Sequence, residues 1–266
     1  MREEFVLVMC LMLLAIVFPA WAGAGDGEIT VTILYDNTAF VPGTEADWGF
    51  SCLVEGTEKT ILFDAGTKPE VFFRNVEALD VDLTEADLVV ISHEHDDHTG
   101  ALARVLEQHR GLTVYHPVSF SGQFVSAVTH AGATSVPVTE PVEIINDVYL
   151  TGEMGGDIKE QSLILRTGDG LVVITGCSHP GIVEILERTQ QILDEKIFMV
   201  VGGFHLLRHS DDEMVAIIEQ FKRLGVVKCG PTHCTGDQQI AAFKDAYGEN
   251  FVAMGSGRVL RFTAAD

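Results

Sequence analysis

Hydrophobic residues recur along this chain in two ways. Where they alternate with polar residues they predict strands, and where they recur every three or four residues they predict helices. Between Ile29 and Leu34 apolar and polar residues largely alternate, which predicts a half-buried strand. The segments 88–91, 171–174 and 197–201 are apolar throughout, which is typical of strands buried on both faces. Further strands are expected at 50–54, 60–63, 112–115, 135–138, 142–145, 148–150, 162–166 and 226–229.

Apolar residues three or four positions apart predict helices at 99–109, 122–132, 180–193, 214–224 and 241–247. Pro180 is placed to begin the third of these, because proline suits the first turn of a helix. A hairpin through Gly255-Ser256-Gly257 is expected to close the chain between residues 251 and 262. Strands dominate both halves with helices between them, which indicates an α/β (α+β) fold.

The first 22 residues have the pattern of an export signal. Residues 5–18 are uninterruptedly apolar, and Ala20-Trp21-Ala22 supplies a small-x-small pattern for cleavage before Gly23. The apolar run is too short for a comfortable membrane span. Acidic residues weaken the basic start of the signal, so an uncleaved N-terminal anchor stays open as an alternative. We expect an exported protein, periplasmic or secreted, with no stable membrane insertion after the signal at 1–22 is removed.

Size and charge limit the classes of function. The chain has 266 residues, 47% of them hydrophobic, which is enough for a large core in one catalytic domain over residues 28–266. Its 17 basic residues face 39 acidic ones, and a net charge of -22 repels nucleic acid and anionic membranes. We therefore expect a small-molecule substrate and no nucleic-acid partner.

The candidate chemistry begins directly after the apolar strand at 88–91. His93 and His95 lie two residues apart, so they project to the same side of an extended backbone. Asp97 and His98 follow at the turn into the next helix. Their side chains can therefore point to a second position next to the one that His93 and His95 share. Imidazole and carboxylate together suit zinc, iron or manganese, so two half-sites for divalent ions are expected. A solvated loop rich in histidine and aspartate is the plainer reading, but such loops rarely follow a buried strand and run straight into a helix.

Other predicted strands end in the same kinds of residue. Cys177 and His179 follow the strand at 171–175, His205 follows the strand at 197–201, and His233 follows the strand at 226–229. If these strand ends meet at one sheet edge, their side chains cluster there. His179 precedes a proline that begins a helix, and a helix N-terminus favours the neutral imidazole that binds metals.

The pattern His93-x-His95-x-Asp97-His98 after an apolar strand resembles the signature of the metallo-β-lactamase superfamily. Further motifs are similar to one branch, which includes a dihydropterin–ribofuranosylaminobenzene-phosphate synthase and many bacterial proteins described only as metal-dependent hydrolases. The similarity covers about residues 28–262. These motifs are Tyr35-Asp36-Asn37-Thr38, Trp48-Gly49-Phe50-Ser51, Phe63-Asp64-Ala65-Gly66, Gly176-Cys177-Ser178-His179-Pro180-Gly181, Gly202-Gly203-Phe204-His205-Leu206 and Pro231-Thr232-His233-Cys234-Thr235-Gly236.

The resemblance implies a four-layer αββα sandwich with the site at one rim of its two sheets. It places Asp64 behind the ligands, where the carboxylate would accept an imidazole N–H, although Asp64 could instead cap the following helix. Glu153 stands where superfamily members often supply a third histidine, and it is either a ligand or an exposed loop residue. Cys177 stands where many relatives carry a bridging aspartate, and it is either a thiolate ligand or a buried thiol. His116 is either a substrate contact or an ordinary strand-end histidine.

The sequence does not decide whether the four cysteines of the expected mature chain are oxidised or reduced. Cys229 and Cys234 could form a disulfide that stiffens the loop of His233, or both could stay reduced. Cys52 is expected to be reduced and buried.

Together these expectations give two ion sites. His93, His95 and His179 would hold one ion, and Asp97, His98 and His233 the other. Zinc is favoured, with iron, manganese or magnesium as alternatives. A metal-activated hydroxide would then hydrolyse a small phosphate ester, lactone or related substrate, which can be anionic, with Asp97 passing on the proton. His205 would either bind a metal ion or act on the substrate as acid or electrophile.

Two other functions remain open. One is a pterin-type transferase that joins two molecules with loss of diphosphate, although an export signal argues against it because pterin intermediates are cytosolic. The other is a non-catalytic metal-binding protein.

Overall fold

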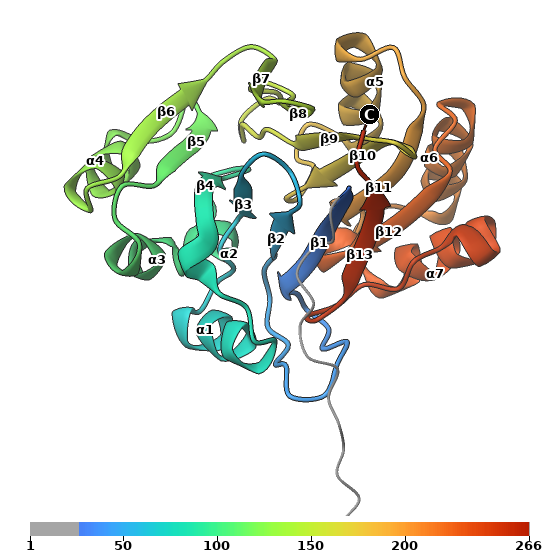
Figure 1. Ribbon diagram of the computed structural model, residues 1–266. Helices are drawn as coiled ribbons and strands as arrows, with labels where there is room; N and C mark the ends of the chain where they lie inside the picture. Colours follow the sequence, from blue (N-terminus) through green and yellow to red (C-terminus); the bar gives the residue numbers. More distant parts are fainter. Residues whose placement is uncertain (1–26, 266) are drawn as a thin grey trace, which may run out of the picture.

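Two β-sheets pack face to face in the computed structural model, which describes residues 27–265 (Figure 1). The predicted export signal at 1–22 therefore lies outside the described residues. Strands β3 to β6 run parallel to one another, and the remaining neighbours in this sheet pair antiparallel. In spatial order the first sheet contains β13 (Val259–Thr263), β1 (Glu28–Tyr35), β2 (Ser51–Glu55), β3 (Thr60–Phe63), β4 (Ala86–Val90), β5 (Thr113–Pro117) and β6 (Thr134–Val138).

The second sheet has six strands and a parallel half. Neighbouring strands β10, β11 and β12 run parallel, and β7 to β10 form antiparallel pairs. Its order is β12 (Lys228–Thr232), β11 (Ile197–Gly203), β10 (Gly170–Thr175), β9 (Leu163–Thr167), β8 (Val148–Leu150) and β7 (Val142–Ile145).

Helices cover the outer face of each sheet. Three of them, α1 (Pro69–Ala78), α3 (Leu102–Gln108) and α4 (Gly122–His130), pack on the first sheet. Three more, α5 (Ile182–Ile192), α6 (Asp211–Arg223) and α7 (Asp237–Tyr247), pack on the second. The short α2 (Asp96–Thr99) follows β4, and 3-10 turns occupy Leu83–Glu85, His233–Thr235 and Gly248–Asn250. These four layers confirm the predicted αββα sandwich.

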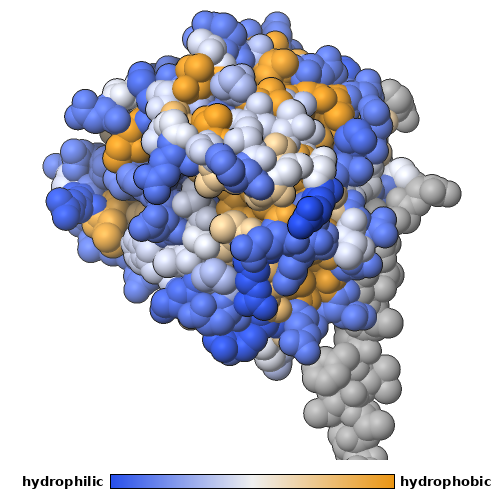
Figure 2. All heavy atoms as spheres, turned by 90° about the vertical axis from the view of Figure 1, so that its left-hand side faces the viewer, coloured by the Kyte–Doolittle hydropathy of each residue, from blue (hydrophilic) through white to orange (hydrophobic). Residues whose placement is uncertain are grey.

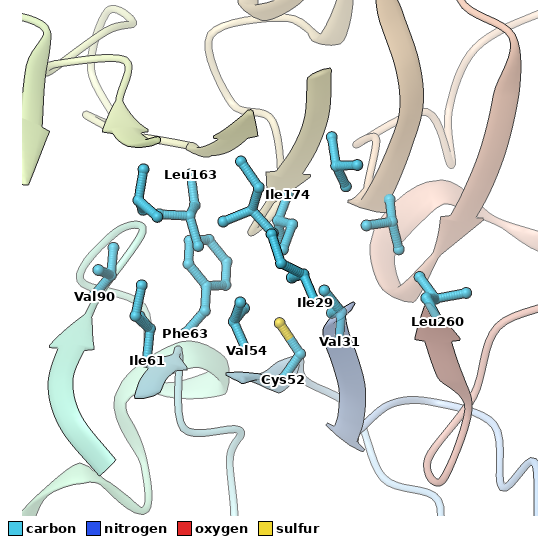
Figure 3. Packing of buried hydrophobic residues seen from close by; sticks show 14 of the residues in the cluster. Ile29, Val31, Cys52, Val54, Ile61, Phe63, Val90, Leu163, Ile174 and Leu260 are labelled. Atoms are coloured by element: carbon cyan, nitrogen blue, oxygen red, sulfur yellow. The ribbon is translucent and has the colours of Figure 1, made fainter. Parts of the chain in front are cut away.

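A hydrophobic core fills the space between the sheets (Figure 3). Phe63 and Val54 from the first sheet meet Leu163 and Ile174 from the second, and all four side chains are fully buried. Strand β4 shows why the segment 88–91 is apolar throughout. Val90 joins this central core, whereas the adjacent Val89 faces the helices on the other side of the sheet.

Two predicted elements are wrong. The helix expected at 99–109 is interrupted after Thr99, because the N–H groups of Gly100 and Ala101 donate to Gly66 and Ala65 instead of continuing the helix. The hairpin expected between residues 251 and 262 does not form. The stretch before β13 instead pairs with the loop after β1, where the Ser256 N–H donates to Thr38 and the Phe40 N–H donates to Ser256.

Hydrophilic side chains predominate on the side that carries α4, with separate apolar patches among them (Figure 2). Among the helices of the described residues, none is long and apolar enough to cross a membrane.

Candidate metal centre

The parallel strands place the predicted site residues at one rim of the sandwich. In the first sheet Phe63 of β3 lies opposite Val90 of β4, so Asp64 and the His93 loop leave the sheet at the same edge. In the second sheet β10, β11 and β12 are also parallel, and Cys177, His205 and His233 follow their carboxyl ends. The carboxyl ends of parallel strands share an edge, which is why residues distant in sequence meet here.

His93, His95 and His179 form a first cluster of nitrogen donors. His93 Nε2 lies 3.0 Å from His95 Nδ1, and the His179 ring lies 4.7 Å from the His93 ring and 4.9 Å from the His95 ring, centroid to centroid. One ring nitrogen from each residue lies within 4.8 Å of the others. His179 Nε2 is buried and has no hydrogen-bond partner among the described residues. A buried polar atom without a partner is costly, so this nitrogen is suited to a cation.

Asp97, His98, Cys177 and His233 form a second cluster. His98 Nε2 lies 3.3 Å from both His233 Nε2 and Cys177 Sγ, and Asp97 Oδ2 lies 3.3 Å from His233 Nε2. Nitrogen, carboxylate oxygen and sulfur within 4.8 Å of one another suit a borderline-soft divalent ion such as zinc. The two clusters are adjacent, since the His93 and His98 rings are 4.2 Å apart.

Asp64 fixes the orientation of both clusters. Its carboxylate accepts hydrogen bonds from His98 Nδ1 at 2.7 Å and from the Ser92 backbone N–H and hydroxyl, each also at 2.7 Å. The Ser92 hydroxyl in turn lies 2.9 Å from His93 Nδ1. The alternative of a helix cap does not hold, because α1 begins after Lys68 without a side-chain cap.

Asn37 and Trp48 contact the second cluster from the loop after β1. Asn37 Oδ1 lies 3.1 Å from His233 Nδ1, and Asn37 Nδ2 donates to the His233 carbonyl. Trp48 Nε1 donates to Asp97 Oδ2 at 2.8 Å, and its ring lies 4.9 Å from the His233 ring. In the sequence these two residues attract attention only as parts of motifs.

Glu160 is a site residue that the sequence did not reveal. Its fully buried carboxylate accepts the backbone N–H groups of Cys177, Ser178 and His179 at 2.8–2.9 Å, so it fixes the loop that presents two candidate ligands. Burial raises its pKa to about 7, against the opposing effect of these hydrogen bonds. Nothing in the local pattern distinguishes Glu160 from an exposed loop glutamate.

The electrostatics of the first cluster favour neutral imidazoles. Burial, followed by the neighbouring imidazoles of His98 and His179, holds the pKa of His93 well below its usual value. Burial and the nearby His205 lower the pKa of His179 to about 4. Neutral rings keep the lone pairs that a metal ion requires.

In the second cluster, neighbouring charges and hydrogen bonds outweigh burial in setting the pKa values. Burial would lower the pKa of His98, but the charge of Asp64 and its hydrogen bond outweigh burial and raise it. Burial would raise the pKa of Asp97, but its hydrogen bond with His233 and the charges of His98 and His233 lower it below the ordinary value. Asp97 is therefore an ionised carboxylate.

Cys177 also belongs to a third group, with His205 and Cys234, whose ligand atoms lie within 4.8 Å of one another. The four cysteines of the described residues are free and buried, so the disulfide considered between Cys229 and Cys234 is absent. Cys234 contacts Cys177 and His205 instead of Cys229, a pairing that spacing along the chain does not predict.

Strained backbone is concentrated at this rim. Four non-glycine residues here have positive φ: Asp64 at 55°, Ser178 at 66°, His205 at 55° and His233 at 51°. Such conformations cost free energy and persist where packing imposes them, which is common at functional sites.

Two predicted site residues lie elsewhere. Glu153 is not a member of these clusters, because its carboxylate accepts the Ser119 N–H at 2.8 Å. His116 is buried, with Nδ1 2.8 Å from the Pro117 carbonyl and Nε2 2.7 Å from the Ser135 hydroxyl. Because both ring nitrogens are occupied, His116 has the ordinary structural role of a strand-end histidine.

Comparison with known proteins decides the family. The sequence profile of the metallo-β-lactamase superfamily matches residues 49–175. A solved metal-dependent hydrolase of the β-lactamase superfamily is 33% identical, with a TM-score of 0.74, over 87% of this chain and 98% of its own. The chain belongs to the metallo-β-lactamase superfamily.

Within this superfamily the relatives carry different names. The 7,8-dihydropterin-6-methyl-4-(β-D-ribofuranosyl)-aminobenzene-5′-phosphate synthase of Methanocaldococcus jannaschii is 27% identical over 90% of this chain and 98% of its own length. The metallo-β-lactamase fold protein YhfI from Bacillus subtilis shares the fold, with a TM-score of 0.66 at 16% identity over 87% of this chain and 99% of its own. The predicted resemblance to this superfamily and to the synthase is confirmed.

Proposed function

We propose that this superfamily member is a hydrolase of small esters, either phosphate esters or lactones, that works with two divalent cations. The proposal rests on one observation: two clusters of metal-binding donors lie side by side at the rim, and one of their nitrogens, His179 Nε2, is buried without a partner. His93, His95 and His179 would hold one cation. Asp97, His98 and His233, joined by Cys177, would hold the other.

A pair of divalent cations supplies Lewis-acid polarisation of the substrate and activation of water near neutral pH. The protein supplies orientation and proton transfer. Asp64 keeps a proton on His98 Nδ1 and thereby leaves Nε2 free to face Cys177 and His233. Asp97 is only partly buried and Trp48 donates to its Oδ2, so the carboxylate is held beside His233, where it would accept a proton from the attacking water.

His205 is placed to serve the leaving group. Its ring lies 4.4 Å from the His179 ring, and its side chain is exposed at the mouth of the site. The hydrogen bond with Cys234 is the largest influence on its pKa and raises it, which favours the protonated form that can donate a proton. We therefore assign His205 as the general acid.

The donor set favours zinc. Imidazole nitrogens and a sulfur outnumber the single carboxylate in the two clusters, whereas magnesium prefers oxygen ligands. Iron shares the preference for imidazole, and manganese can bind the Asp97 carboxylate, so metal analysis has to distinguish both from zinc. The net charge of -22 supports a small substrate over nucleic acid.

The proposal is tested by turnover. Purified protein is loaded with zinc, iron or manganese and assayed with p-nitrophenyl phosphate, bis-p-nitrophenyl phosphate and a γ-lactone. We expect hydrolysis of at least one substrate class, abolished by chelator, restored by metal and reduced in the His205→Ala variant. A fully metallated protein that hydrolyses none of them would contradict the proposal.

A transferase is the second candidate, because the relative that aligns over 90% of this chain and 98% of its own length is named as a 7,8-dihydropterin-6-methyl-4-(β-D-ribofuranosyl)-aminobenzene-5′-phosphate synthase. In that reaction the same clusters would activate a diphosphate leaving group, and an arylamine would replace water as nucleophile. A dihydropterin diphosphate would then be consumed only when an arylamine is present. Consumption without arylamine would favour the hydrolase.

A further inference from the structure

Cys177 and Cys234 are two free thiols that meet at the rim, although they are 57 residues apart in the chain. Their sulfur atoms lie within 4.8 Å of each other, and the Cys234 thiol donates to the Cys177 carbonyl at 3.5 Å. A disulfide bond is about 2.05 Å long. Side-chain rotation and a small movement of the two loops would therefore bring the sulfurs to bonding distance.

The pair meets across strand β11. Cys177 follows β10 and Cys234 follows β12, and β11 lies between these two strands. Strands two positions apart in a sheet are about 9–10 Å apart, so the contact needs an empty place at the end of the middle strand. Gly203 supplies it, because a Cβ there would lie 2.7 Å from Cys234 Sγ and 2.5 Å from the Gly176 carbonyl oxygen.

Solvent reaches this pair of thiols. Cys234 is 5% exposed and Cys177 is 3% exposed, whereas the other two cysteines that the structure describes are 0% exposed. A cavity of about 570 Å³ is lined by Ser178, which follows Cys177, and by His205, which is hydrogen-bonded with Cys234. An oxidant as small as hydrogen peroxide therefore has a route to the sulfurs.

Cys177 connects the pair to the second cluster. Its sulfur lies 3.3 Å from His98 Nε2 and within 4.8 Å of the ligand atoms of Asp97 and His233. Cys234 is outside that cluster. One sulfur of the pair is thus a candidate ligand of the second ion, and the other is a free neighbour.

We propose that Cys177 and Cys234 are an oxidative modification site, at which a peroxide forms a reversible disulfide and the disulfide releases the ion of the second cluster. A disulfide sulfur is no longer a thiolate, so the second cluster would keep only its imidazoles and carboxylate. The release of the ion rests on the proposed function. Formation of the disulfide does not.

The oxidation takes place in two steps. The Cys234 sulfur attacks one oxygen of hydrogen peroxide, the O–O bond breaks, and the departing oxygen takes the thiol proton and leaves as water. The resulting sulfenic acid is then attacked by the Cys177 sulfur. The S–OH bond breaks, and the hydroxide becomes a second water with a proton from Cys177 or, where an ion has displaced that proton, from solvent. The sulfurs lose two electrons, which reduce one peroxide to two waters.

Peptide mapping of the reduced, metal-loaded protein tests the modification. About one equivalent of hydrogen peroxide per chain should remove two thiols and link the peptides that contain Cys177 and Cys234. Dithiothreitol should restore both thiols. Absence of this link after peroxide treatment, whether or not thiols are lost, would overturn the proposal.

Variants assign the two steps. Cys177→Ala should stop at the sulfenic acid of Cys234, which dimedone traps, and Cys234→Ala should keep Cys177 as a free thiol. Cys229→Ala is the matched control, because Cys229 is buried and belongs to none of the donor groups among the described residues, so the link should form as in the wild type. A loss of two thiols in Cys234→Ala would contradict the assignment.

Metal release is measured separately with a colorimetric chelator. Peroxide should release one of the two ions of the wild type, and reduction should allow that ion to bind again, whereas Cys234→Ala should retain both ions. A linked protein that keeps both ions would contradict the release. A protein that forms the link but binds no metal would contradict the proposed function and still support the modification site.

Discussion

The Asp64 carboxylate and the His98 imidazole are both fully buried, and Asp64 Oδ2 lies 2.7 Å from His98 Nδ1. This contact fixes which ring nitrogen of His98 carries the proton. When the ring is neutral, Nε2 keeps its lone pair directed at Cys177 and His233, which is the arrangement that a metal ligand needs.

Asp64→Asn should therefore weaken metal binding about 10- to 100-fold. The amide N–H₂ cannot accept the His98 Nδ1 proton, so the proton would move to Nε2 and occupy the ligand position. Asparagine also tolerates the positive φ of Asp64, which limits any change in the backbone. Affinity is measured by competition with a chelator.

Asp80→Asn is the control for this variant, because Asp80 is exposed and has a similar φ of 54°. It should bind metal as the wild type does. Equal affinities of the Asp64→Asn and wild-type proteins would show that Asp64 does not orient a ligand.

Cys177 should bind the second ion as a thiolate. Its sulfur lies 3.3 Å from His98 Nε2, and a bound cation would deprotonate a thiol in that position. Cobalt-substituted protein is expected to show near-ultraviolet thiolate-to-cobalt charge transfer that Cys177→Ala lacks and Cys229→Ala retains. The same band in Cys177→Ala would assign the sulfur ligand to another residue.

Gly203 permits the close approach of the loops in the second sheet. A Cβ there would lie 2.5 Å from the Gly176 carbonyl oxygen, 2.7 Å from Cys234 Sγ and 3.2 Å from His233 Cδ2. Gly203→Ala should lower the free energy of unfolding by about 1–3 kcal/mol and reduce metal content. Gly156→Ala is the control, because a Cβ there meets nothing within 4 Å. Urea unfolding of both variants gives the comparison, and equal losses would contradict the steric account.

Asp36 gives the folded protein a defined dependence on pH. Burial raises its pKa to about 7 from 3.8, although its hydrogen bonds with Thr232 and Thr38 oppose this. The folded state then binds the proton more tightly than the unfolded state. The stability that this proton contributes is complete below about pH 4 and is lost as the pH rises through about 7.

Asp36→Asn removes this titration. Relative to wild type, the free energy of unfolding of Asp36→Asn should rise between pH 4 and 8 by an amount on the order of 3 kcal/mol. Urea unfolding with a chelator present measures this difference without a contribution from metal release. A difference between the two proteins that stays constant with pH would show that Asp36 is not held protonated.

The sequence predicts those parts of the site that depend on local spacing. The His93 motif follows a strand, and parallel strands place the ends that carry His179 and His233 at one rim. Those parts of the site that depend on contacts between distant segments cannot be predicted from local spacing. Glu160 caps the loop of His179 across the fold, and Cys234 meets Cys177 and His205 only because Gly203 has no side chain.

The same limit explains the errors in secondary structure. The helical spacing of residues 99–109 is real, but the N–H groups of Gly100 and Ala101 find partners in the turn at Ala65 and Gly66, and the helix breaks. No local pattern reveals that competition, because the turn lies more than thirty residues earlier in the chain.

Elemental analysis of the purified protein and two variants tests the metal centre most directly. The wild type should contain two divalent ions per chain, His179→Ala should lose the ion of the first cluster, and His233→Ala should lose the ion of the second. His130→Ala, at an exposed histidine outside the clusters, should keep both. A wild-type protein that binds no stoichiometric metal, or two variants that each retain both ions, would contradict the proposed site.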